Sequence, residues 1–184
     1  SVDLIILPGG FSFGDYLRSG AMASKSKIIP EVIKHANSGK FLLGICNGFQ
    51  ILSEIGLLKG ALIQNNKLKF LGKDCFIKKK HENKFNKLIK KDQVLQIPVA
   101  HNEGNFYCSN DDLNYLNDEE LIAFEYCMGS FSNSDANING SINNIAGITN
   151  EGKNVLGMMP HPERAYQNFH TSMDGKSIIE SLIL

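Results

Sequence analysis

The sequence predicts an α/β fold with a mostly parallel, open sheet and helices on both faces. Two short apolar runs, residues 2–7 and 41–45, have the leucine and β-branched character of buried strands. Each run is followed by a glycine-containing turn and then by a helical pattern, at residues 28–36 and 47–55. Alternation of strands and helices is typical of parallel sheets, because two parallel strands need a long crossover connection.

Local signals mark where these first elements begin and end. Pro8, Gly9 and Gly10 stop the first strand. Pro30 falls in the first turn of the first helix, where its missing N–H costs nothing. Gly56 follows the second helix and is expected to end it in a left-handed conformation.

The middle of the chain predicts a small antiparallel or mixed layer at the edge of the sheet. Short strand-like runs separated by polar turns cover residues 61–64, 68–71, 75–80 and 94–100. A short helix is expected at 111–116, and a further strand at 121–126.

The last part of the chain predicts a loop, a hairpin and a closing helix. Residues 133–144 are rich in Asn and Ser and predict a surface loop. Residues 145–149 and 155–159 predict a hairpin, and residues 174–184 a helix. Because no repeat or long linker divides the sequence, we expect a single domain over residues 1–184.

The composition argues against several classes of function. The 19 basic and 19 acidic residues balance, which argues against nucleic acid or an anionic membrane as a partner. No apolar run is long enough to cross a bilayer, and no signal peptide is visible. The four cysteines have neither zinc-site nor CxxC spacing, so we expect reduced thiols, a cytoplasmic location and no metal site; they are Cys46, Cys75, Cys108 and Cys127.

The segment around Cys46 is the most informative in the chain. Gly44-Ile45-Cys46-Asn47-Gly48 lies between a predicted strand and a predicted helix. A strand, a sharp turn flanked by glycines and a helix are the layout of a nucleophile elbow, with Cys46 in the place of the usual serine. The helix beginning at Asn47 points its N–H groups toward the sulfur, and this is expected to favour the thiolate. Cys46 is therefore the candidate nucleophile.

A cysteine nucleophile needs a base and a group that orients the base. His161 follows an apolar strand and lies between Pro160 and Pro162, which restrict the backbone where the strand ends. Glu163 lies two residues further on, and in an extended segment its side chain would point the same way as the imidazole. We therefore expect His161 to be the base and Glu163 to hold its tautomer.

Further residues are candidates for binding the substrate. A tetrahedral oxyanion needs backbone N–H donors from two directions. The N–H of Asn47 is one, and the turn at Gly9 and Gly10 is the natural source of the other. His101 and Glu103 follow a predicted strand, where they could bind the polar end of a substrate or equally belong to a surface loop.

Several longer sequence segments resemble the class I, triad-type glutamine amidotransferases, and among them the glutaminase subunits of phosphoribosylformylglycinamidine synthases. The resemblance runs from about residue 2 to residue 164. It rests on the strings at residues 8–18, 44–50, 56–58, 100–104, 139–147 and 157–164. The family's roles would then fall on three residues of this chain. Cys46 would attack the glutamine amide and form a thioester, His161 would protonate the ammonia and then activate water, and Glu163 would orient His161.

The resemblance also implies a set of binding residues and a partner. Gly10 and Asn47 would hold the oxyanion, while Gln50 and Gly9 would lie near the bound glutamine. The ammonia would pass to a synthetase subunit, in a complex with or without a small accessory subunit. That subunit would use ATP to convert phosphoribosylformylglycinamide to the amidine in purine biosynthesis. The sequence contains no P-loop and no GxGxxG, so no cofactor is expected in this chain, and ATP and Mg²⁺ are expected on the partner.

One departure from the family concerns the N-terminus, and two other functions remain open. Family members begin with a further strand–helix unit, so the chain is expected to be truncated there, with an exposed apolar sheet edge. One alternative function is another elbow-type cysteine hydrolase, such as a γ-glutamyl hydrolase or a peptidase. The other alternative is a scaffold subunit whose triad is silent.

Overall fold

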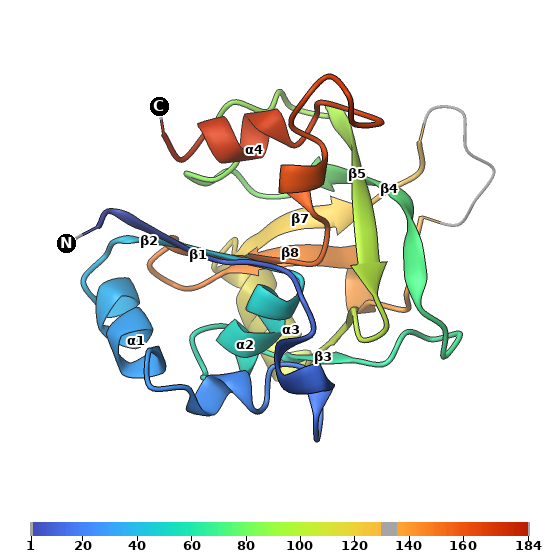
Figure 1. Ribbon diagram of the computed structural model, residues 1–184. Coiled ribbons are helices and arrows are strands. Elements are labelled where there is room, and N and C mark those ends of the chain that lie inside the picture. Colours follow the sequence, from blue (N-terminus) through green and yellow to red (C-terminus); the bar gives the residue numbers. More distant parts are fainter. Residues whose placement is uncertain (1, 130–135, 184) are drawn as a thin grey trace.

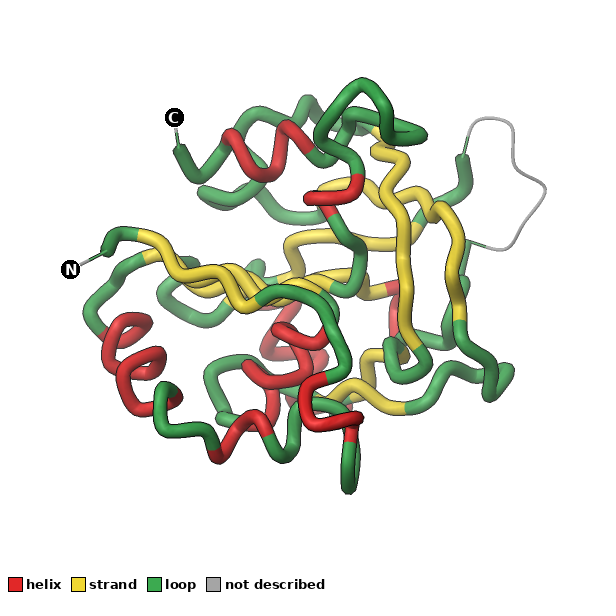
Figure 2. The backbone as a smooth tube through the Cα atoms, in the orientation of Figure 1, coloured by secondary structure: helices red, strands yellow, loops and turns green. Residues whose placement is uncertain are grey.

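The computed structural model describes residues 2–129 and 136–183. The strands are β1 (Leu4–Leu7), β2 (Phe41–Ile45), β3 (Ala61–Ile63), β4 (Leu71–Lys79), β5 (Val94–His101), β6 (Asn105–Tyr107), β7 (Ile122–Tyr126), β8 (Ile145–Thr149) and β9 (Val155–Met158). The helices are α1 (Ile29–Asn37), α2 (Asn47–Glu54), α3 (Asn110–Asp118) and α4 (Lys176–Glu180). Short 3₁₀ turns are η1 (Ser12–Asp15), η2 (Ala23–Lys25), η3 (Ile142–Asn144) and η4 (Pro162–Arg164). Figure 2 shows how these helices and strands are distributed along the backbone.

A mixed sheet with the strand order β1-β2-β9-β8-β7-β4-β5 forms the centre of the molecule. The pairings β1–β2 and β2–β9 are parallel, whereas the pairings from β9 to β5 are antiparallel. The predicted α/β class is confirmed, and the antiparallel part extends further than an edge layer. β3 and β6 form a second, two-stranded antiparallel sheet.

The helices cover both faces of the central sheet, as predicted. Figure 1 shows α1, α2 and α3 below the sheet and α4 above it. α1 packs through Ile29, Val32 and Ala36, which recur at helical spacing on one face. α3 begins at an N-cap, where the backbone N–H of Asp112 donates to Ser109 Oγ at 3.1 Å. Over residues 2–129 and 136–183, no helix is both long enough and apolar enough to cross a bilayer.

The apolar core explains why the two runs at the centre of the sheet form strands. β2 from Leu42 onward and all of β9 are buried, as expected for strands covered on both faces. Phe49 of α2 lies in the same cluster as these strands and has no exposed surface. Each such side chain contributes about 1.5–3 kcal/mol of hydrophobic free energy on burial.

Three expectations for the elements differ from the structure. The runs predicted at 68–71 and 75–80 are a single strand, β4, which begins only at Leu71. The three-residue strand β6 was not predicted, because its only support is its pairing with β3. The closing helix is shorter than predicted and is confined to α4, and Leu184 lies outside the described residues.

The predicted surface loop at 133–144 can be compared with the structure only in part, because residues 133–135 lie outside the described residues. Its second half is not a surface loop throughout. Asn139 and Ser141 are 0% and 1% exposed. The Asn139 amide donates to the carbonyl of Gly104 at 2.7 Å, and this buried hydrogen bond explains why a polar segment lies inside the protein.

Candidate active site

Cys46 lies between β2 and α2, at the predicted elbow. Its backbone has φ 51° and ψ −104°, a conformation that is strained for a residue with a side chain. The backbone N–H of Cys46 donates to the carbonyl of Met158 at 2.8 Å, which ties the elbow to β9. The turn therefore presents the sulfur at the carboxyl ends of the parallel strands, where α/β proteins bind their ligands.

The glycines on either side of Cys46 allow α2 to pack directly against the sheet. A Cβ atom at Gly48 would overlap the carbonyl oxygen of Leu7 in β1. A Cβ atom at Gly44 would lie 2.5 Å from Leu52 Cδ1 and 2.8 Å from the carbonyl carbon of Gly48. Close backbone approach, rather than flexibility, thus requires both glycines.

The strand order brings His161 to Cys46. β9 lies next to β2 with Met158 opposite Ile45, so the residues that follow the two strands emerge side by side. A Cβ atom added at Gly9 would lie 2.5 Å from His161 Cε1 and 3.5 Å from Cys46 Cβ. The thiol residue and the imidazole therefore both border the same point of the turn after β1, as the sequence predicts.

The His161 ring is oriented by Glu163. His161 is 1% exposed, and its Nδ1 lies 2.6 Å from Glu163 Oε1. The contact is made through the η4 turn, which begins at Pro162, and not through an extended i, i+2 arrangement. Because the carboxylate accepts the Nδ1 proton, Nε2 is the ring atom that can take a proton from the thiol. Nε2 is buried and has no hydrogen-bond partner among the described residues.

The resting thiol of Cys46 is protonated. Its pKa is raised to about 12, mainly by burial and to a smaller extent by the nearby charges of Glu163 and Asp15. The N–H of Asn47 and the charge of Arg164 lower the pKa, but by less than burial raises it. The expectation that the helix start favours the thiolate is therefore not met at rest. The sulfur instead donates weakly to the carbonyl of Ala100, at 3.5 Å.

Of the two predicted oxyanion donors, only the N–H of Asn47 contacts the sulfur in the structure, and the role of the Gly10 N–H stays a prediction. The space beside Gly10 is open, because a Cβ atom there would meet nothing within 4 Å. Sequence reasoning missed Ser12, whose hydroxyl donates to Asn47 Oδ1 at 2.6 Å and holds the loop after β1 against the elbow.

Gln50 and Glu103 also lie at this site, but their polar groups contact protein atoms. Gln50 Oε1 accepts from Asn47 Nδ2 at 2.9 Å, and Gln50 Nε2 donates to the carbonyl of Glu103 at 2.6 Å. The carboxylate of Glu103 accepts the backbone N–H of Ser19 at 3.1 Å. These contacts place both residues beside the elbow, and their predicted contact with substrate stays a prediction.

His101 is buried at the end of β5 and does not lie in a surface loop, and its predicted contact with substrate stays a prediction. It is 2% exposed, and its Nδ1 lies 3.1 Å from Asn65 Oδ1. Burial, followed by the charge of His161, lowers the pKa of His101 to about 4. The imidazole is therefore neutral at physiological pH. Asn65 was missed because nothing in the local polar sequence distinguishes it from a turn residue.

The segment between β1 and α1 packs along α2 and is attached to its last residue. Arg18 forms a bidentate pair with Glu54 of α2, with both N–O distances at 2.6 Å. Gly20 has φ 83°, and a Cβ atom there would lie 2.9 Å from the backbone of Gln50 and Ile51. The predicted site residues come from four segments of the chain, which are residues 9–10, 46–50, 101–103 and 161–163.

Comparison with known proteins identifies the family of this chain. Residues 1–181 match the family described as the CobB/CobQ-like glutamine amidotransferase domain. The chain is similar to the phosphoribosylformylglycinamidine synthase subunit PurQ of Pelagibacter ubique, with 49% identity over 184 residues, covering 98% of this chain and 80% of that protein. The corresponding PurQ subunit of Synechocystis is 48% identical over 183 residues, covering 98% of this chain and 81% of that protein.

A solved structure is similar in both sequence and shape. The structure of PurLQS from Thermotoga maritima matches with a TM-score of 0.86 and 42% sequence identity. The match covers 98% of this chain and 78% of that chain. The mixed sheet with its helices on both faces therefore recurs in a relative that was solved as part of an assembly.

Proposed function

The chain belongs to the family of CobB/CobQ-like glutamine amidotransferase domains, and we propose that Cys46, His161 and Glu163 are its catalytic triad. It is the glutaminase component of phosphoribosylformylglycinamidine synthase, and it hydrolyses glutamine to supply ammonia for purine biosynthesis. The observation that supports the triad most directly is the approach of Cys46 and His161 to the same point beside Gly9.

The first half of the proposed reaction forms a thioester. The thiol of Cys46 gives its proton to His161 Nε2, and the sulfur attacks the side-chain carbonyl carbon of glutamine. The N–H groups of Asn47 and Gly10 hold the resulting oxyanion. When the intermediate collapses, the C–N bond breaks and the nitrogen takes the proton from His161, so ammonia leaves. Glu163 stabilises the imidazolium while it exists.

The second half releases glutamate. His161 Nε2 takes a proton from a water molecule, and the hydroxide attacks the thioester carbon. The C–S bond breaks, and the sulfur of Cys46 recovers its proton from His161. Gly9 lets the imidazole approach the thiol closely enough for both transfers, since a Cβ atom there would overlap the ring.

This chemistry needs only a thiol, an imidazole, a carboxylate and backbone N–H groups. We therefore assign ATP and Mg²⁺ to the synthetase subunit and no cofactor to this chain. We place Gln50, Gly9, His101 and Glu103 around the bound glutamine. A cytoplasmic location is supported by the cysteines, which are all free in the structure.

The synthetase subunit must take up the ammonia before it escapes into water, so it is expected to cover the rim of the site. Two loops form this rim, residues 11–17 and 68–70, and the rings of Phe11 and Phe70 lie 6.3 Å apart. Exposed apolar patches of this kind mark protein interfaces, and we propose that the synthetase binds here. The large apolar side chains more than half exposed on the rim are Phe11, Phe13, Tyr16, Leu17, Leu68 and Phe70.

The proposed function is tested by assaying the chain with its synthetase subunit. We expect glutamate to form from free glutamine, and glutamine to support amidine synthesis in place of added ammonia. Strong preference for γ-glutamyl peptides would favour a γ-glutamyl hydrolase, and no hydrolysis under any condition would favour a silent scaffold.

The same assay tests whether the synthetase subunit binds at the rim. Tyr16→Glu should abolish glutamine-dependent synthesis while synthesis from added ammonia continues. Ile28→Glu changes an equally exposed side chain outside the rim and should have no effect.

Substituting Gly9 by alanine should strongly lower the rate of glutamine hydrolysis without unfolding the protein. The new methyl group would overlap His161 Cε1 and push the ring away from Cys46, and a displacement of this size lowers the rate by on the order of a hundredfold. Glutamine kinetics and thermal unfolding measure the two effects. Equal activity of the Gly9 variant and the wild type would contradict the close approach.

A further inference from the structure

Asn65, which follows β3, holds the turn that ends β5 through both ends of its side-chain amide and through its backbone N–H. It is 1% exposed. Its Nδ2 donates to the carbonyls of Lys69 and His101, at 2.8 and 3.0 Å. Its Oδ1 accepts the backbone N–H of Gly104 at 3.1 Å, and its own backbone N–H donates to the carbonyl of Asn102 at 2.9 Å. A buried amide with this many partners can adopt only one orientation.

That orientation determines the tautomer of His101. Because Asn65 Nδ2 faces two carbonyl oxygens, the atom facing the His101 ring must be Oδ1, which only accepts hydrogen bonds. His101 Nδ1 therefore carries the proton, and Nε2 has a bare lone pair. His101 Nε2 is buried and has no partner among the described residues. The ring also lies against Gly104, where a Cβ atom would overlap it.

The turn at residues 101–104 is connected to the oxyanion donor by a chain of hydrogen bonds. The carbonyl of Glu103 accepts from Gln50 Nε2, and Gln50 Oε1 accepts from Asn47 Nδ2. On its other side the turn is held by Asn139, which donates to the carbonyl of Gly104. A shift of the turn would therefore reach Asn47, whose backbone N–H faces the nucleophile.

We propose that Asn65 is a positioning residue of the glutaminase site, which holds His101 as the neutral Nδ1–H tautomer and, through Glu103 and Gln50, holds Asn47 in place. The inference rests on the proposed function, because Asn47 matters only if it binds an oxyanion. Asn65 does not contact the nucleophile. The inference explains how it nevertheless affects the rate of glutamine hydrolysis.

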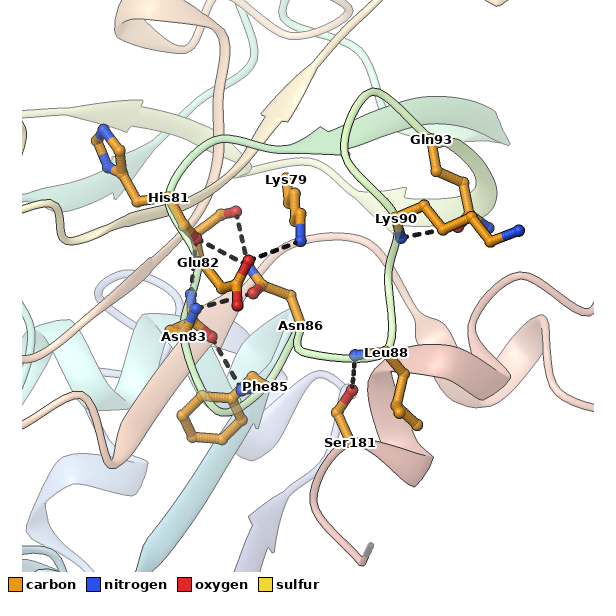
Figure 3. A network of polar contacts seen from close by, with 11 residues as sticks. Lys79, His81, Glu82, Asn83, Phe85, Asn86, Leu88, Lys90, Gln93 and Ser181 are labelled. Atoms are coloured by element: carbon orange, nitrogen blue, oxygen red, sulfur yellow. Dashed lines mark hydrogen bonds and ion pairs between the residues drawn. The ribbon is translucent and has the colours of Figure 1, made fainter.

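A merely structural role for Asn65 makes a different prediction, and Asn86 provides a matched control. Asn86 is 0% exposed, and its Nδ2 also donates to two carbonyls, those of His81 and Ala123. Its Oδ1 also accepts a backbone N–H, that of Asn83. Figure 3 shows Asn86 within the loop between β4 and β5, where the N–H of Leu88 donates to Ser181, the residue after α4. Among the described residues, the side-chain hydrogen bonds of Asn86 go to His81, Asn83 and Ala123 and not to the elbow at residues 44–48.

The experiment compares Asn65→Asp with Asn86→Asp, each assayed with the synthetase subunit present and each unfolded thermally. Both variants lose two buried donors, and both should lower Tm. Only Asn65→Asp should lower kcat for glutamine, by on the order of a hundredfold. KM should change less, because a displaced oxyanion donor weakens the transition state more than the ground state. Asn65→Ser, which adds no charge, replaces Asn65→Asp should that variant fail to fold.

A measurement on the unmutated protein keeps the two parts of the proposal separate. Nitrogen-15 NMR of the imidazoles should show His101 protonated at Nδ1 and not at Nε2 near neutral pH. The Nε2–H tautomer, or wild-type kcat in the Asn65 variants, would overturn the inference. Absence of glutaminase activity in the wild type would instead remove the proposed function, and the NMR result would still report on the tautomer.

Discussion

Replacing Cys46 by alanine is expected to abolish glutamine hydrolysis. Removing the nucleophile of a triad enzyme lowers kcat by on the order of 10⁶-fold, because no other group can form the covalent intermediate. The fold should survive, since the change removes one sulfur atom and leaves the backbone hydrogen bond to Met158 in place. Glutamate formation measured with the synthetase subunit present, together with thermal unfolding, separates these two effects.

Two comparisons make the result on Cys46 specific. Cys127→Ala removes a partly exposed thiol outside the site and should leave glutamine hydrolysis unchanged. A glutamine-like diazo ketone should label Cys46 in the wild type and leave the Cys46 variant unlabelled. Amidine synthesis from added ammonia should continue in the Cys46→Ala complex. Turnover of glutamine near the wild-type rate in this variant would end the assignment of the nucleophile.

Replacing Glu163 by glutamine should lower kcat by on the order of 10⁴-fold, as expected when the carboxylate that orients a catalytic histidine is lost. The neutral amide cannot stabilise the imidazolium, and it can present its N–H₂ group to Nδ1, which would favour the wrong tautomer. His161 is almost fully buried, so water does not replace the lost interaction. Because Glu163 itself is 41% exposed on its side chain, the substitution should change Tm little.

The matched control for Glu163 is Glu125→Gln. Glu125 is also ion-paired, with Lys80 at 3.1 Å, but it lies in β7 away from the elbow. This variant should keep its glutamine kinetics. If both substitutions reduced kcat alike, the loss would reflect general electrostatics, and Glu163 would have no special part in orienting His161.

The pKa of Cys46 shows how a correct local argument can be outweighed. The helix start does lower the pKa of the thiol, as predicted, through the N–H of Asn47. Burial acts in the opposite direction and is larger, because a thiolate loses its hydration in the closed elbow. Sequence patterns reveal the dipole, which is local, whereas burial depends on segments far away in the chain. We therefore expect His161 to activate the thiol during the reaction and not in advance.

Some of the residues around the proposed substrate site could be predicted from local sequence, and others could not. Gln50 and Glu103 were predicted to bind the substrate, and the structure shows their polar groups joined in one chain of hydrogen bonds beside the elbow. Asn65, which holds that chain, gave no signal, since an asparagine between two strands is ordinary turn composition. Its importance comes from contacts with residues 101–104, more than 30 positions away.

The candidate catalytic residues and the elements that carry them could be predicted from the amino-acid order, because strand, elbow and helix signals each depend on neighbouring residues. Cys46, His161 and the glycine turns were found in this way. The insertion of β9 beside β2, which joins Cys46 to His161, is a feature of the strand order. That order depends on which buried faces pack best over the whole chain, so only the tertiary structure decided it. The tautomer of His101, the protonated thiol and the role of Asn65 follow from the same packing.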